Sequence, residues 1–154
     1  MSSRKEQKIN EFCKEGNLED FREVLALIIE EMEKSGCRIY ARYNENRSSH
    51  EFFVKDCCMR ICLKDIYNEP VELIWTILHE FGHHLSGRVK FDEIDSSTKI
   101  NREKIAWEKA RPFVLKFPLL AEKIKKFDSY AEECLKGYIN GLKISLPDTP
   151  VTIY

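Results

Sequence analysis

The chain has 154 residues, of which 43% are hydrophobic and 33% are charged, as is typical of one globular domain. Its 25 basic and 26 acidic residues give a formal net charge of −1, which excludes a strong net attraction to nucleic acid or to an anionic membrane. No apolar run reaches the roughly 20 residues that span a bilayer, and no apolar segment follows the charged N-terminus as an export signal requires. We therefore expect a soluble, cytoplasmic, single domain over residues 1–154, with no nucleic acid or membrane partner.

Six cysteines are spread along the chain, and a reducing compartment favours free thiols. Cys58 and Cys62 do not have the two-residue separation that is usual in paired zinc ligands. We therefore expect the cysteines to act as small buried hydrophobic residues.

The N-terminal third of the chain predicts helices followed by strands. Residues 2–14 predict a weakly amphipathic helix, and apolar residues at helical spacing predict a stronger one over 18–34, capped by Asn17 and stopped at Ser35 and Gly36. The aromatic and β-branched segments 37–43 and 50–56 flank a polar run and predict a β-hairpin. Segment 57–65 alternates apolar and polar residues, which predicts a half-buried third strand.

A helix over 70–86 is predicted next, with Asn68 as its cap, Pro70 in its first turn and a stop at Gly87. It contains the pattern His-Glu-x-x-His as His79, Glu80 and His83. Residues four apart lie on one face of a helix, so both imidazoles can bind one metal ion. The pattern is typical of zinc peptidases, in which the glutamate acts as general base.

The remaining elements complete the expected fold. After a polar connector over 88–99, a helix is predicted over 97–110 that ends before Pro112, followed by helical segments over 119–127 and 128–141 and an extended tail. The expected class is α+β. An N-terminal helix (18–35) precedes a short antiparallel or mixed three-stranded sheet, which packs on the motif helix, and C-terminal helices (119–141) follow the catalytic core (37–114).

A catalytic zinc ion needs a third protein ligand besides the two histidines. Glu103 shares a helix face with Trp107 and Ala110, so its carboxylate is expected to point inward, where it needs a cation as partner. Its separation from His83 is typical of zinc peptidases with a glutamate ligand. Gly82, inside the motif, predicts a close approach of a neighbouring backbone. The sequence favours Glu103 and leaves open the alternatives Glu108, Asp92, Glu93 and Asp95.

This ligand set predicts one zinc ion and hydrolytic chemistry. Zinc lowers the pKa of its bound water towards about 7, Glu80 takes the proton, and the hydroxide attacks a polarised peptide carbonyl. Glu80 then passes the proton to the leaving amine. His84 points about 100° away from His83, so we do not expect it to be a ligand. The candidates for an oxyanion donor are Tyr130, Tyr138, His50, Arg102 and Arg111.

Three pieces of the chain resemble the ImmA/IrrE family of zinc metallopeptidases, small intracellular gluzincin-like enzymes of bacteria, phages and mobile elements. They are the strand MRICLKD, the segment LHEFGHHLSG, and the helix with Glu103, Ala106, Trp107 and Ala110. The resemblance covers about 38–114, and the chain departs from the family pattern at Ile105 and Trp107. It implies a zincin-like fold and cleavage of a regulatory protein.

The resemblance also implies how a substrate binds. The strand before the motif helix is expected to offer an open edge to which an extended peptide adds, with Arg60, Ile61 and Cys62 on that strand and Tyr130 as substrate-binding residues. The alternative function is a zinc-stabilised interaction module of a phage or mobile element, which binds a host regulator without cleaving it.

Overall fold

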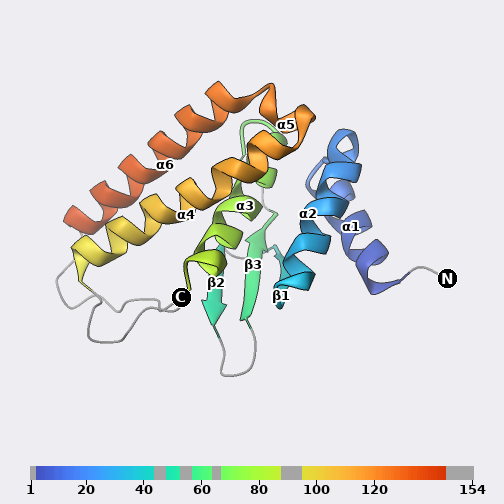
Figure 1. Cartoon of the computed structure of the whole chain (residues 1–154), viewed down its shortest axis with the longest axis horizontal. Helices are drawn as coiled ribbons and strands as arrows, with labels where there is room; N and C mark the ends of the chain where they lie inside the picture. The colour runs from blue at the N-terminus through green and yellow to red at the C-terminus, as the bar shows by residue number, and fades with distance from the viewer. Residues whose placement is uncertain (1–2, 44–47, 53–56, 64–66, 88–94, 145–154) are drawn as a thin grey trace.

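The computed structural model describes residues 3–43, 48–52, 57–63, 67–87 and 95–144 (Figure 1). The elements combine helices with a small sheet, which is the expected α+β class. In the described part, no helix is long and apolar enough to cross a membrane. The tail after Ile144 and most of the predicted connector lie outside the described residues. The elements are α1 (Arg4–Glu15), the 3-10 turn η1 (Glu19–Phe21), α2 (Arg22–Lys34), β1 (Cys37–Arg42), β2 (Ser49–Phe52), β3 (Cys57–Cys62), α3 (Val71–Ser86), α4 (Ser96–Lys116), α5 (Pro118–Ala121) and α6 (Ile124–Ile144).

The three strands form one sheet in the order β1, β3, β2. β1 is parallel to β3, with Cys37 opposite Cys57, and β2 is antiparallel to β3, with Ser49 opposite Arg60. The predicted hairpin between the first two strand segments is therefore wrong, because β3 lies between them. Composition and alternation indicate that a segment is a strand but do not say which strand is its neighbour.

The position of β3 also corrects the expected substrate edge. Because β3 pairs with a strand on each side, segment 57–65 does not offer an open edge, and β2 is the outer strand on its side of the sheet. Ile61 and Cys62 are fully buried and Arg60 is half-buried. The expected peptide-binding role of these three residues on an open edge is therefore wrong.

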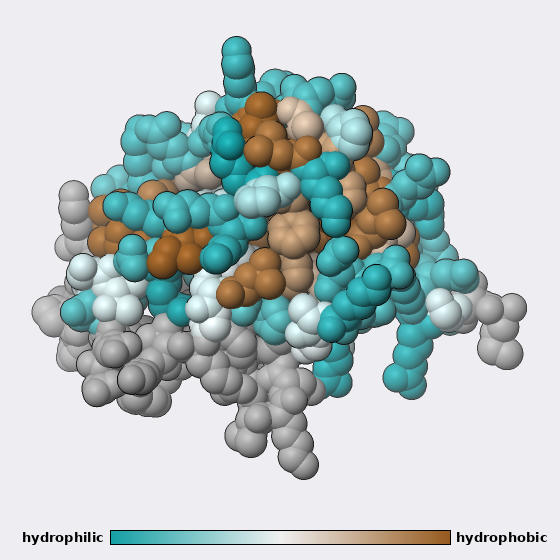
Figure 2. All heavy atoms as spheres, in the orientation of Figure 1, coloured by the Kyte–Doolittle hydropathy of each residue, from teal (hydrophilic) through white to brown (hydrophobic). Residues whose placement is uncertain are grey.

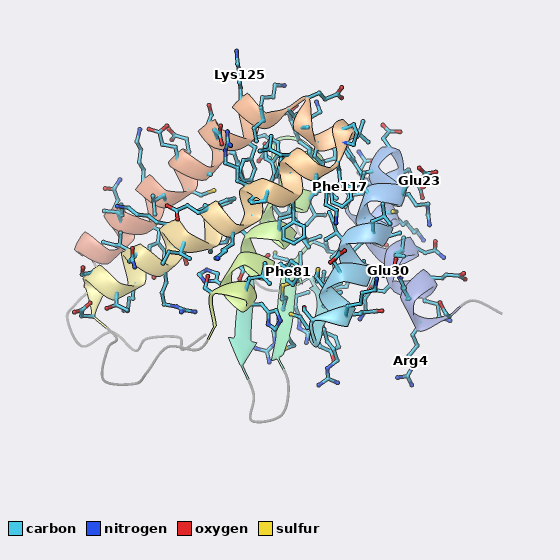
Figure 3. The ribbon with its side chains drawn as sticks, in the orientation of Figure 1. Arg4, Glu23, Glu30, Phe81, Phe117 and Lys125 are labelled. Carbon is cyan, nitrogen blue, oxygen red and sulfur yellow. The ribbon has the colours of Figure 1, made fainter. Side chains whose placement is uncertain are left out.

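α1 packs against α2, and α2 packs against β1 of the sheet (Figure 3). α1 buries Ile9, Phe12 and Cys13, its expected apolar positions. The helix predicted from residue 18 instead starts as η1 and becomes α-helical at Arg22. Asn17 does not cap it, since its φ is +57°, a left-handed conformation that asparagine adopts more readily than most residues.

α3 begins at Val71 and ends, as predicted, before Gly87, whose φ is +81°. Asn68 does not act as the cap. The buried carboxylate of Glu72 instead accepts hydrogen bonds from the backbone N–H groups of Asn68 and Glu69, at 3.3 and 3.2 Å. A side chain inside the first turn thus reaches back to satisfy backbone amide groups just before the helix.

α4 is longer than the predicted helix over 97–110 and continues through Pro112 to Lys116. Proline has no backbone N–H, so the carbonyl one turn before Pro112 lacks its usual partner. Because Pro112 is exposed, that carbonyl lies on the water-facing side of the helix. The two predicted C-terminal segments become the short α5 and one continuous α6.

Figure 1 shows α4 and α6 running side by side, with α3 beside them. α3 contacts β2 and β3 as well as α4, so it lies at the centre of the fold. The face in Figure 2 is mostly hydrophilic, with smaller hydrophobic groups between. Among the five cysteines whose side chains are described, none forms a disulfide and four are buried, as expected of small core residues.

Candidate metal centre

Two neighbouring helices bring His79, His83 and Glu103 together. Nε2 of His79 lies 2.9 Å from Oε2 of Glu103, and Nε2 of His83 lies 3.0 Å from Oε1 of the same carboxylate. Their candidate ligand atoms all lie within 4.8 Å of one another. The exposed fractions are 7%, 1% and 8%, so the group is buried. This buried group could hold a metal ion, as the sequence predicted.

The close crossing of α3 and α4 explains why the three side chains meet. A Cβ atom on Gly82 would lie 2.1 Å from the backbone oxygen of Ala106, so the two helix backbones are in direct contact at this point. Gly82 immediately precedes His83, and Ala106 lies one turn after Glu103. The crossing therefore places the carboxylate over the two imidazoles, and the predicted close approach at Gly82 is confirmed.

The charges of the centre are mutually stabilising. Burial lowers the pKa of His79, but the hydrogen bond to Glu103 and the charges of Glu80 and Glu103 outweigh it, so the pKa is raised above its ordinary value of 6.5. Burial raises the pKa of Glu103, but hydrogen bonds with His79 and His83 outweigh it and hold that pKa far below its ordinary value of 4.5. The buried carboxylate is thus ionised and suited to a cation.

Of the alternative third ligands, the two that the structure describes are exposed and outside the buried group. Glu108 is exposed on α4. Asp95 is exposed and accepts a hydrogen bond of 2.7 Å from the backbone N–H of Thr98, which makes it the N-cap of α4. Asp92 and Glu93 are outside the described residues.

His84 has a role in packing. Its Nε2 lies 3.0 Å from the backbone oxygen of Ser35, at the end of α2, and its ring stacks on Phe81 at 5.8 Å between centroids. It is not one of the three residues whose ligand atoms converge.

Aromatic side chains from α4 and α6 wall one side of the centre. The Trp107 ring stacks on the His79 ring, with 4.1 Å between centroids and 27° between planes. Phe127 and Tyr130 of α6 meet Trp107 edge-on, at 5.8 and 5.9 Å. The sequence predicted that Trp107 points inward. It gave no signal for the stacking, which depends on how α3 and α4 cross.

Glu80 is adjacent to the ligand His79 on α3 and only 6% exposed. One turn earlier, Thr76 Oγ1 lies 3.3 Å from the hydroxyl of Tyr130.

Tyr67, which the sequence analysis did not single out, donates its hydroxyl to the backbone oxygen of Cys62 at 2.8 Å. Burial raises the pKa of Tyr67 to about 12, and the negative charge of Glu80 adds to this rise. Hydrogen bonds with Ser48 and Thr76 lower the pKa but do not outweigh burial. Two tyrosine hydroxyls therefore lie near the Thr76 turn that precedes Glu80.

The other candidates for an oxyanion donor lie at different places in the structure. Arg111 pairs with Asp128 on the exposed surface, with two contacts of 3.0 Å. Arg102 donates to the backbone oxygen of Gly87 at 3.2 Å. Tyr138 is half-buried, further along α6, and the side chain of His50 lies outside the described part of the structure. Among the candidates whose side chains are described, Tyr130 is thus the one that belongs to the aromatic wall.

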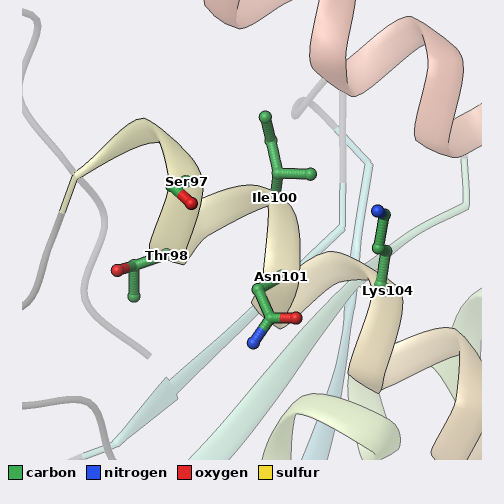
Figure 4. Close-up of a pocket in the computed structure, with 5 residues that line it drawn as sticks. All are labelled: Ser97, Thr98, Ile100, Asn101 and Lys104. Atoms are coloured by element: carbon green, nitrogen blue, oxygen red, sulfur yellow. The ribbon is translucent and has the colours of Figure 1, made fainter.

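A separate hollow of about 550 Å³ lies along the first turns of α4 (Figure 4). None of its described lining residues is an acid, a histidine or a cysteine, so it offers no further metal ligand. Its lining consists of Ser97, Thr98, Ile100, Asn101 and Lys104.

No protein-family model matches the chain, and no curated protein or solved structure matches it either. Membership of the ImmA/IrrE family therefore stays a prediction that depends on the sequence pieces quoted above.

Proposed function

We propose that the chain is a cytoplasmic zinc-dependent endopeptidase that cleaves a regulatory protein. The observation that carries this proposal is the buried convergence of His79, His83 and Glu103, with the carboxylate of Glu80 buried beside them. Two imidazole nitrogens and one carboxylate are a common ligand set of catalytic zinc, whereas structural zinc sites usually have four protein ligands. The buried general base beside the ligands further favours catalysis.

Each residue has a role in this proposal. His79, His83 and Glu103 would hold the zinc ion, which when bound supplies a Lewis acid and an acidified water. Glu80 would accept a proton from that water and deliver it to the leaving amine. The pKa of Tyr130 is raised chiefly by burial, so its hydroxyl stays protonated at neutral pH and can donate a hydrogen bond to the substrate carbonyl oxygen.

Replacing the general base tests the chemistry separately from metal binding. Glu80→Gln is expected to retain one zinc ion per chain and to lose peptide cleavage by about 10²- to 10⁴-fold, because the amide cannot accept the proton. Zinc content is measured by elemental mass spectrometry, and cleavage by mass spectrometry of a peptide library incubated with the protein. Glu108→Gln, an exposed change on α4, is the matched control and should behave as wild type.

Cleavage by Glu80→Gln at the wild-type rate would contradict the role of Glu80. Intact peptides and an intact regulator after incubation with zinc-loaded wild type, together with normal regulator binding by Glu80→Gln, would instead favour the interaction module.

A further inference from the structure

The second ring nitrogen of His79 is unusual for a metal ligand. Nδ1 of His79 is buried and has no hydrogen-bond partner in the described part of the chain. A metal-binding histidine almost always donates its other ring N–H to a carboxylate, a carbonyl or a water, and this bond fixes the orientation of the ring. Another contact must therefore fix the imidazole plane of His79.

The geometry points to Trp107 as that contact, and we propose that it is a positioning residue of the metal centre. The face-to-face contact of the two rings, 4.1 Å between centroids, restrains rotation of the imidazole and so keeps Nε2 directed at Glu103. This inference rests on the proposed zinc site. It concerns how His79 is held there, not which residues bind the ion.

Trp107 is itself well held. It lies one turn after Glu103 on α4, so a single turn of helix supplies both a candidate ligand and the surface that orients another. Its exposed fraction is 8%, and the rings of Phe127 and Tyr130 meet it edge-on, a favourable arrangement for aromatic pairs. The indole therefore has little freedom to move away from His79.

Loss of the indole has a specific expected effect. The imidazole would gain rotational freedom, since Nδ1 has no hydrogen bond in the described part of the chain to hold the ring, and water could enter beside it. Zinc binding would then have to order a mobile ligand, which costs conformational entropy. Affinity should fall even where the protein stays folded.

The test compares Trp107→Ala with Trp107→Phe, which keeps a stacking ring. We expect the zinc dissociation constant of Trp107→Ala to rise about 10- to 100-fold in chelator competition, as when a contact that orients a metal ligand is lost, and that of Trp107→Phe to stay near wild type. The visible spectrum of the cobalt-substituted protein should change for Trp107→Ala and be restored in Trp107→Phe. Phe127→Leu is the matched control, because the Phe127 ring packs on the rings of Trp107 and Trp75 and, among the described ring contacts, makes none with His79.

The outcomes separate this inference from the proposed function. Trp107→Ala with wild-type zinc affinity and cobalt spectrum overturns the inference and leaves the zinc site standing. An equal loss in Phe127→Leu overturns it as well, since general destabilisation would then explain the effect. If Trp107→Ala does not fold, Trp107→Leu keeps the apolar volume without a ring and takes its place. A wild type that binds neither zinc nor cobalt overturns the zinc proposal and this inference together.

Discussion

Gly82→Ala is expected to destabilise the domain and to weaken zinc binding at least about tenfold, although it adds a single methyl group. The new Cβ atom would lie 2.1 Å from the backbone oxygen of Ala106, 2.8 Å from its carbonyl carbon and 3.0 Å from its Cα. These are backbone atoms of a helix and cannot rotate away, so α3 and α4 must separate by roughly 1 Å to restore van der Waals contact. Overpacking of this kind costs about 1–3 kcal/mol or more.

The same separation explains the effect on the metal. Ala106 and Glu103 are on adjacent turns of α4, so moving α4 away moves the carboxylate away from His79 and His83. The distances of 2.9 and 3.0 Å between these groups leave little room for such a shift. Metal–ligand distances in working sites vary by only about ±0.2 Å, so even a small displacement lowers affinity.

Thermal unfolding of the metal-free protein and zinc titration measure the two effects. Gly137→Ala is the matched control, because a Cβ at Gly137 of α6 meets nothing within 4 Å. That change should stabilise the protein by up to about 1 kcal/mol, since alanine favours the helix over glycine. Wild-type stability and affinity in Gly82→Ala would show that the two helices do not cross as closely as described.

The motif helix was the most predictable element. Its stop at Gly87 and the close contact at Gly82 follow from local spacing, and the structure confirms them. Glu103 could be chosen because a carboxylate on the apolar face of a helix needs a partner. Both inferences need only the spacing of residues within a single helix.

Features that depend on several segments were not predictable in the same way. Nothing in the strand segments indicates that β3 lies between β1 and β2, because pairing depends on the whole sheet. The passage of α4 through Pro112 depends on tertiary packing that outweighs a local preference. The stacking of Trp107 on His79 requires the crossing geometry of two helices, so no pattern within either helix could show it.

Removal of the third ligand is expected to have the largest effect on the metal. Glu103→Ala should weaken zinc binding by more than the roughly 100-fold typical of losing a residue that only orients a ligand, because a direct ligand is lost. Glu108→Ala, on the exposed face of the same helix, should leave the dissociation constant unchanged. Competition with a chromogenic chelator measures both. The reverse result would identify Glu108 as the ligand and contradict the described centre.

The same carboxylate should control how stability depends on pH in the metal-free protein. The pKa of His79 is raised above 6.5 in the folded state, so its stabilising contribution is complete below 6.5 and is lost as pH rises through the raised value. The pKa of Glu103 is lowered from 4.5, so its contribution is present above 4.5 and is lost as pH falls towards the lowered value. Metal-free wild type should therefore be most stable between about pH 4.5 and pH 6.5, where both contributions are complete.

Zinc should reverse the slope above pH 6.5, because imidazole must lose its proton to bind the ion. The rise in melting temperature on adding zinc should thus grow with pH, while the melting temperature of the metal-free protein falls over the same range. Glu103→Ala should flatten both trends, since His79 loses its hydrogen-bonded anion and the ion loses a ligand. Parallel pH profiles for the metal-free and zinc-loaded wild type would show that protons and zinc do not compete for the imidazole of His79. The ion would then have to bind elsewhere.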